Sequence, residues 1–248
     1  MNFKEKLAER KPLIGTVLAL PSPEITEMLA SMDLDWLWLD MEHSVIDAPT
    51  MQRMLQATHN KIPCLVRPPS HDEVWIKKIL DAGADGLLVP MVNSANDAQH
   101  IVEMSKYPPQ GNRGVGISRA HKYGLRFSEY MERANDEIAV ILQAETTMAL
   151  KNISEIAAVP GIDAVFIGPY DLSASLGKMG QLTNPEVKQA IQTIAEACKK
   201  AGVRLGIFAA TADAVEPFIQ QDFTLLAIGT DGLHMAQSAR KILKALKQ

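Results

Sequence analysis

The chain has 248 residues, of which 47% are hydrophobic, and its formal net charge is −4 at pH 7. This length and composition are sufficient for one large α/β domain with a sizeable core. The sequence pI is near 5.9, and no basic stretch is long enough to follow a phosphate backbone, so we expect no nucleic-acid partner.

The first residues, MNFKEKLAERKP, carry charges but no apolar core of the kind that signal peptides have. No apolar run approaches the roughly 20 residues that a membrane-spanning helix needs, so we expect no membrane segment. The two cysteines, Cys64 and Cys198, lie far apart in apolar or helical surroundings. This predicts buried free thiols and a cytoplasmic location.

Eight short apolar runs recur along the chain and are predicted to be strands. Each run is almost continuously apolar, which is typical of strands that are covered on both faces in a parallel sheet. The predicted strands are residues 13–19, 35–40, 62–67, 85–89, 138–143, 163–168, 203–208 and 224–229.

Helical patterns lie between these strands. Residues 22–32 begin with a Ser-Pro cap signal, and residues 184–202 run from Asn-Pro to a terminal Gly. The alternation predicts an α/β fold, a (β/α)₈ TIM barrel formed as a single domain over residues 1–248. A doubly wound sheet is the alternative, but it requires a Gly-rich phosphate turn after the first strand, where this chain has LALPSPE.

One segment, at about residues 107–124, departs from the alternation. Its sequence, YPPQGNRGVGISRAHKYG, is rich in Gly, Pro and Arg, and a loop insertion of this length in a compact barrel is usually functional. Gly114 and Gly116 resemble part of a dinucleotide motif, but no strand precedes them and the third Gly is missing, so that reading has little support.

Polar side chains collect where the predicted strands end. Barrel enzymes carry their chemistry at the carboxyl ends of the strands, so these residues are predicted to meet at one mouth. The polar residues that follow the second, third, fifth and sixth strands are Asp40, Glu42, His43, Arg67, Gln143, Glu145 and Asp171.

Glu145 and Asp171 follow neighbouring strands and are candidate metal ligands. Two carboxylates without Cys or paired His suit a hard divalent ion such as Mg²⁺ or Mn²⁺. Either acid alone is equally consistent with capping the following helix, but the pair at one mouth favours a metal.

His43 is a candidate general base. Asp40, three positions earlier, is placed to hold one ring nitrogen and leave the other free near neutral pH, although a simple loop hydrogen bond is the alternative. Glu42 is predicted to be a structural acid that points away. Arg67 is either a salt-bridge partner or a group that holds a carboxylate or an oxyanion. No strand end carries a lysine, which excludes a Schiff-base aldolase and leaves metal-dependent carbonyl chemistry.

Taken together, six stretches of the chain resemble the HpcH/HpaI aldolase family of metal-dependent class II pyruvate aldolases, which includes 4-hydroxy-2-oxoheptanedioate and 2-dehydro-3-deoxyglucarate aldolases. They keep the family's order and spacing over most of residues 14 to 210. The stretches are LDMEHS, LVRPP, LDAGADGLLVPMVNSANDA, YPPQGNRGVGISRAHKYG, QAETTMALKNISEIAAVPGIDAVFIGPYDLSASLG and GQLTNPEV.

The resemblance implies that Glu145 and Asp171 bind a divalent cation, Mg²⁺, Mn²⁺ or Co²⁺. It also implies that His43 is the catalytic base, with Asp40 as its orienting partner. Arg67 matches the arginine that contacts the bound oxo-acid and stabilises its enolate.

The resemblance also implies that Gln143 lies beside the metal and the substrate. The backbone amides around Tyr170 and Asp171 would receive the pyruvate carboxylate, and Asp81 would complete the site of a neighbouring subunit. Ser44 and Tyr170 replace smaller residues that are frequent in the family. We expect them to narrow the aldehyde pocket without removing a catalytic group.

The expected activity is that of a lyase that reversibly cleaves a 4-hydroxy-2-oxo acid into pyruvate and an aldehyde through a metal-stabilised enolate. The alternatives are a CoA-ester lyase of the citrate lyase β-subunit type and a barrel that binds an oxo-acid without turnover. The first requires a basic patch for the CoA phosphates, and the long loop offers only the scattered Arg113, Arg119 and Arg126.

The last helical segment, HMAQSARKILKALKQ, carries an apolar stripe that must pack against another surface. It would either close its own barrel or, as the resemblance implies, exchange between subunits of a trimer-based or hexameric homo-oligomer. The stripe consists of Met235, Ala239, Ile242, Leu243 and Leu246.

Overall fold

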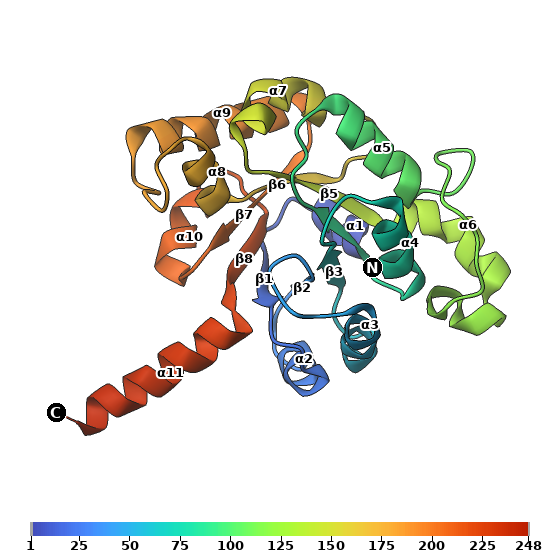
Figure 1. Ribbon diagram of the computed structural model, residues 1–248, viewed down its shortest axis with the longest axis horizontal. Helices are drawn as coiled ribbons and strands as arrows, with labels where there is room; N and C mark the ends of the chain where they lie inside the picture. The colour runs from blue at the N-terminus through green and yellow to red at the C-terminus, as the bar shows by residue number, and fades with distance from the viewer. Residues whose placement is uncertain (1, 248) are drawn as a thin grey trace.

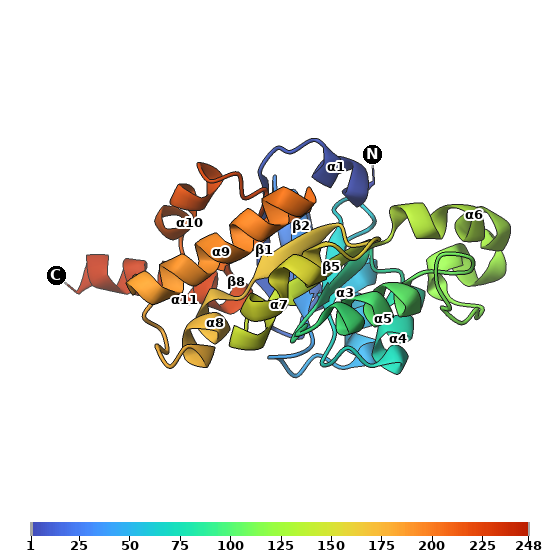
Figure 2. The same ribbon diagram turned by 90° about the horizontal axis from the view of Figure 1, so that it is seen from above.

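Eight parallel strands form a closed barrel, and their order around the barrel follows the chain (Figure 1 and Figure 2). The computed structural model describes residues 2–247. Each predicted strand is present, with both ends within two residues of the expected position, so the predicted (β/α)₈ barrel is confirmed. The strands are β1 (Leu13–Leu18), β2 (Trp36–Asp40), β3 (Cys64–Arg67), β4 (Gly86–Val89), β5 (Ala139–Ala144), β6 (Ala164–Ile167), β7 (Arg204–Ala209) and β8 (Leu225–Thr230).

The helices surround the barrel. The predicted helices at 22–32 and 184–202 are α2 and α9; the Ser22 side chain accepts the N–H of Ile25, and Gly202 ends α9 at φ +77°. The sequence pattern did not predict α1 or α6. The helices are α1 (Phe3–Ala8), α2 (Pro23–Ala30), α3 (Ala48–Ala57), α4 (Glu73–Asp81), α5 (Ala95–Ser105), α6 (Phe127–Glu137), α7 (Thr147–Ala157), α8 (Pro169–Ser175), α9 (Pro185–Ala201), α10 (Ala212–Ile219) and α11 (Asp231–Leu246), with a 3₁₀ segment at Arg119–Gly124.

Two apolar layers share the strands, because successive side chains of a strand point to opposite faces. One set fills the barrel interior, where the rings of Trp36, Trp38 and Phe166 pack edge to face, and the other set packs against the helices. Phe3 of α1 packs against Trp36 in the interior set. A Cβ atom at position 206 would lie 2.3 Å from the ring of Phe166, so Gly206 is required for this packing.

An aspartate directly before each of the strands β2, β4 and β6 caps the preceding strand. Its carboxylate accepts a backbone N–H that the sheet ladder leaves unpaired, which satisfies a donor at the amino end of the barrel. The N–H groups of Ile14, Cys64 and Val140 donate to Asp35, Asp85 and Asp163 respectively, each at 2.8 Å.

Two predictions from composition concern the thiols and membrane segments. Cys64 and Cys198 are both buried and free, as predicted, while the cytoplasmic location inferred from them stays a prediction. Among residues 2–247, no helix is both long and apolar enough to cross a bilayer.

The final helix, α11, leaves the barrel and projects away from it in both views (Figure 1 and Figure 2). Its first turn is anchored to β1 and to the segment after it. The Asp231 carboxylate accepts the N–H groups of Ala19 and Leu20, and His234 Nε2 lies 2.9 Å from Thr16 Oγ1. Beyond this anchor the helix is exposed from residue 234 to residue 247, so its apolar stripe does not close its own barrel.

The strand caps lead to a prediction about stability. We expect Asp163→Ala to lower the free energy of unfolding by about 1–3 kcal/mol, because the buried N–H of Val140 loses its acceptor. Urea denaturation measures the change. Asp33→Ala, which removes an exposed carboxylate just before β2, is the control and should leave the midpoint nearly unchanged. Equal midpoints for the Asp163 variant and the native protein would contradict the proposed capping role.

Candidate active site

The strand alternation brings three polar residues into one layer at the carboxyl end of the barrel. Trp38, Leu65 and Ile141 point into the interior, so residues two positions later on the same strands do so as well. The residues placed in this way are Asp40, Arg67 and Gln143, with exposed fractions of 3%, 6% and 2%. These three side chains therefore lie together at one mouth of the barrel, as predicted.

Arg67 is the centre of the site. Its Nε and Nη2 atoms donate to the two carboxylate oxygens of Asp40 at 2.9 and 2.7 Å, a bidentate pair. Its Nη1 lies 3.1 Å from Glu42 Oε2 and 3.4 Å from Gln143 Oε1, and the guanidinium stacks 4.6 Å from the ring of Trp38. Burial opposes the charge on Arg67, but the hydrogen bonds and charges of its acidic neighbours outweigh it, so the pKa of Arg67 is raised.

The structure differs from the expectation that Asp40 orients the ring of His43. Both carboxylate oxygens of Asp40 bind Arg67, and Oδ1 also accepts the backbone N–H groups of Glu42 and His43, at 3.0 and 3.3 Å. Asp40 therefore fixes the backbone of the segment that carries His43. The physical reason is that Asp40 and Arg67 are paired residues in the β2–β3 register. The guanidinium therefore lies directly beside the carboxylate.

Glu42 does not point away from the site, contrary to the expectation from its position. Its Oε2 atom lies 3.1 Å from Arg67 and 3.7 Å from His43 Nε2, while the His43 side chain is 64% exposed. Burial raises the pKa of Glu42, against the attraction of Arg67 and His43. Glu42 is thus a site residue that spacing along the chain did not reveal.

The carboxylate of Glu145 lies deep in the mouth and is 3% exposed. One oxygen accepts the N–H of Met91 at 2.7 Å, and the other accepts the amide of Gln143. A Cβ atom at position 168 would lie 2.9 Å from Glu145 Oε2, so Gly168 is needed for the close approach of β6.

Negative charge is in excess around Glu145. Burial raises its pKa to about 7; the N–H of Met91 opposes this, and the charges of Glu42 and Asp171 reinforce it. Arg67 is the nearby cation, but its guanidinium already serves Asp40 and Glu42. The negative charge of the carboxylates at this mouth therefore exceeds the positive charge of the neighbouring side chains.

Asp171 and Tyr170 lie in the first turn of α8, directly after β6, and both side chains are exposed. The backbone N–H groups of a first helical turn have no partner within the helix, which makes those of Tyr170 and Asp171 candidate donors at the mouth. Pro169 occupies the first helical position, where it has no N–H to lose.

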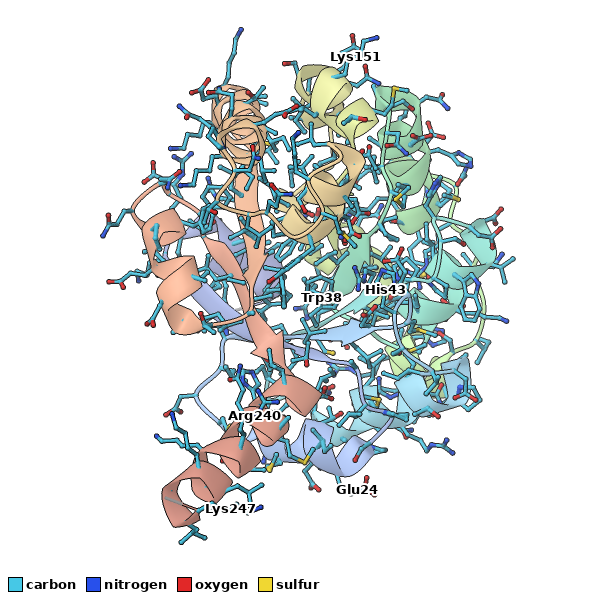
Figure 3. All side chains as sticks on the ribbon, turned by 60° about the vertical axis from the view of Figure 1, so that its left-hand side comes forward. Glu24, Trp38, His43, Lys151, Arg240 and Lys247 are labelled. Atoms are coloured by element: carbon cyan, nitrogen blue, oxygen red, sulfur yellow. The ribbon has the colours of Figure 1, made fainter. Side chains whose placement is uncertain are left out.

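Most of these groups line a cavity of about 260 Å³ at the mouth of the barrel, and Glu42 and Glu145 lie behind its lining. In Figure 3, Trp38 and His43 lie near the middle of the barrel, whereas Arg240 and Lys247 lie out on α11. The lining residues are Val17, Ala19, Trp38, Asp40, His43, Arg67, Gln143, Gly168, Pro169, Tyr170, Asp171, Phe208 and Thr230.

Asp81 does not line this cavity. It ends α4 and accepts a hydrogen bond from Arg113 Nη2 at 2.7 Å. The Arg113 guanidinium is fully buried between the rings of Tyr107 and Tyr130, at 4.6 and 5.9 Å, and so anchors the long loop to α4. The predicted role of Asp81 in a neighbouring site stays a prediction.

Comparison with known proteins gives consistent matches over nearly the whole chain. Residues 14–238 match the family model described as HpcH/HpaI aldolase/citrate lyase. A hydroxypyruvate/pyruvate aldolase of Deinococcus radiodurans is 40% identical over 99% of this chain and 90% of its own length. A 4-hydroxy-2-oxo-heptane-1,7-dioate aldolase of Klebsiella pneumoniae is 40% identical over 97% of this chain and 91% of its own.

The fold is matched by a crystal structure of a family protein from Burkholderia cenocepacia. It superimposes with a TM-score of 0.95 at 35% identity and covers 99% of this chain and 98% of that one. The match of the family model and the relatives at 40% identity agree with the six stretches that carried the resemblance. The chain belongs to the HpcH/HpaI aldolase/citrate lyase family.

Proposed function

We propose that the protein is an aldolase, a carbon–carbon lyase that reversibly cleaves a 4-hydroxy-2-oxo acid into pyruvate and an aldehyde. The observation that carries the proposal is the buried Arg67 guanidinium beside Glu42, Gln143 and the Glu145 carboxylate in one mouth. The relatives at 40% identity are named aldolases, which supports this activity over a CoA-ester lyase.

A divalent cation, Mg²⁺, Mn²⁺ or Co²⁺, fits the acids of the mouth, with Glu145 and Asp171 as its ligands. Carboxylate oxygens are the ligands that such hard ions prefer, and the local excess of negative charge is what a divalent ion would balance. In residues 2–247, no three His, Cys, Asp or Glu side chains form a ready cluster. Two carboxylates suffice for an ion that keeps several waters or binds substrate oxygens.

The cation, when bound, supplies a Lewis acid for the keto oxygen of the substrate. The chain's own residues do the rest of the binding. The N–H groups of Tyr170 and Asp171 receive the substrate carboxylate, because they are free donors at a helix N-terminus. The Gln143 amide holds Glu145 in place and lies next to the keto group.

Cleavage begins when His43 removes the proton from the C4 hydroxyl. The C3–C4 bond then breaks, the aldehyde leaves with C4, and the electron pair passes to C3 to give the enolate of pyruvate. The positive charge of Arg67 stabilises the enolate oxygen, and return of the proton to C3 completes pyruvate. The His43 side chain is 64% exposed at the mouth, where an incoming substrate can reach it. The segment that carries it is held through the backbone by Asp40.

A lysine-based aldol mechanism has no support from the cavity. Among its described lining residues the groups that can carry positive charge are Arg67 and His43, and none is lysine. A Schiff-base mechanism needs a lysine amine inside the site.

Metal removal tests the cation. We expect exhaustive EDTA treatment to abolish pyruvate formation and Mg²⁺, Mn²⁺ or Co²⁺ to restore it. Glu145→Ala should lose Mn²⁺ binding as measured by electron paramagnetic resonance, a readout that does not depend on activity. Glu132→Ala, on the exposed part of α6, is the matched control and should bind Mn²⁺ normally. Full activity after EDTA, or pyruvate trapped on a lysine by borohydride, would contradict the proposal.

A second test separates the base from the ligands. His43→Ala should lower kcat for aldol cleavage by about 10²–10⁴, the usual effect of losing a general base, while Mn²⁺ affinity stays near that of the native protein. His59→Ala removes an exposed histidine that pairs with Glu27 outside the mouth and should leave kcat unchanged. Normal turnover by the His43 variant would assign the base to another group.

We also propose that α11 mediates a homo-oligomer, trimer-based or hexameric. The large apolar side chains of this helix lie exposed beyond its anchored first turn. In a single chain they would contact water, which is unfavourable. A second copy of the chain is the occupant that suits them, because the family resemblance implies helix exchange. The exposed residues are Met235, Ile242, Leu243 and Leu246.

Light scattering coupled to size exclusion measures the assembly. We expect the native chain to elute as an oligomer and the double variant Ile242→Asp, Leu243→Asp to dissociate, because two carboxylates enter the apolar stripe. Lys241→Asp, Lys244→Asp places the same side chains on polar positions of the same helix and should stay assembled. A fully active native monomer would contradict both the assembly and the shared role of Asp81.

A further inference from the structure

The cavity at the mouth has two chemically different halves. Its charged groups and Gln143 come from β2, β3, β5 and the turn into α8, whereas Val17, Ala19 and Phe208 come from β1, the residue after it and β7, which flank β8 with its lining residue Thr230. Trp38 of β2 stands at the border, stacked on Arg67. A substrate that spans the cavity therefore meets charge at one end and apolar surface at the other.

The apolar half is a wall formed chiefly by aromatic rings. The ring of Phe208 packs edge-on against Trp38 with centroids 6.5 Å apart, and the ring of Tyr170 packs against Phe208 at 6.2 Å. Val17 and Ala19 complete the wall from β1 and the residue after it. Tyr170 is 40% exposed and forms the outer end of the wall.

Among the described residues that line the cavity, none on the apolar side carries a positive charge. The two lining residues that can carry positive charge are Arg67, already paired with two acids, and His43. The three arginines in and just after the long loop are paired within their own chain, whereas Lys122 of the same loop is exposed. Arg113 pairs with Asp81, Arg119 donates to the carbonyls of Ala82 and Leu55, and Arg126 pairs with Glu129.

We propose that the aldehyde handled by this enzyme carries no carboxylate and lays an apolar chain on the wall formed by Val17, Trp38, Tyr170 and Phe208. The inference rests on the proposed aldolase function. Arg67 and the amides of α8 are engaged by the pyruvate half, so a second carboxylate would be buried against the wall without a partner, which is strongly unfavourable. A dioate, of the kind named for the Klebsiella pneumoniae relative, is therefore a poor substrate for this chain.

Two aldehydes of equal size test the proposal. We would add pyruvate to 4-methylpentanal and to 4-oxobutanoate, which have the same number of non-hydrogen atoms and differ in a terminal isopropyl or carboxylate group. We expect kcat/KM to favour 4-methylpentanal by at least about tenfold, because the carboxylate has no partner at the wall. An equal or higher kcat/KM for 4-oxobutanoate would overturn the proposal.

A charge variant gives the second arm. Tyr170→Arg places a guanidinium at the outer end of the wall and should raise kcat/KM for 4-oxobutanoate by at least about tenfold relative to Tyr170→Leu, its apolar control. The same comparison with 4-methylpentanal should show no such gain. If Tyr170→Arg gives no gain for 4-oxobutanoate, Tyr170 does not face the end of the aldehyde and the assigned wall is wrong.

Exchange of the C3 hydrogens of pyruvate with deuterium, followed by proton NMR, keeps the two proposals distinguishable. This exchange reports enolate formation and needs no aldehyde. If deuterium exchange occurs but the enzyme prefers 4-oxobutanoate, the proposal of an apolar aldehyde is wrong and the aldolase function stands. Absence of exchange would overturn the aldolase function and the inference that rests on it.

Discussion

The bidentate ion pair between Arg67 and Asp40 is the interaction on which the site depends. Both groups are almost completely buried, and removing one partner of such a pair typically costs about 3–5 kcal/mol because the other is left unpaired. The pair also fixes two further elements. Asp40 holds the backbone that carries His43, and Nη1 of the guanidinium contacts Glu42 and Gln143. A lysine in place of Arg67 would keep the charge but lose this fork of contacts.

Much of the fold follows from the sequence because parallel strands that are covered on both faces appear as continuous apolar runs. The same reading located the site, since the barrel topology brings the strand ends together wherever they lie along the chain. The alternation of side chains then selects Asp40, Arg67 and Gln143 as inward-facing, since each lies two residues after a core residue of the interior. For these residues, strand position alone was sufficient to place them at the mouth, and the structure adds their inward direction.

The partners of the acids were not predictable in the same way. Spacing along the chain places Asp40 near His43, but the register of β2 and β3 places it opposite Arg67, and the cross-strand contact prevails because the guanidinium offers two donors. Glu42 was misread for the same reason, since its contact with Arg67 crosses strands. Aligning the polar ends of neighbouring predicted strands would have revealed the pair. The helix α1 escaped prediction because it is short and its apolar residues pack beneath the barrel rather than along it.

The two ends of the barrel meet opposite electrostatic demands. At the amino end, single carboxylates accept backbone N–H groups and remove unpaired donors, which stabilises the fold. At the carboxyl end, the buried Glu145 shares one cation with Asp40 and Glu42, and both burial and the neighbouring acids disfavour its charge. Such an arrangement weakens the fold unless a cation or a substrate completes it, which is the expected signature of a site kept for chemistry. The exposed α11 is unfavourable for a similar reason. Its apolar stripe contacts water until a second surface covers it.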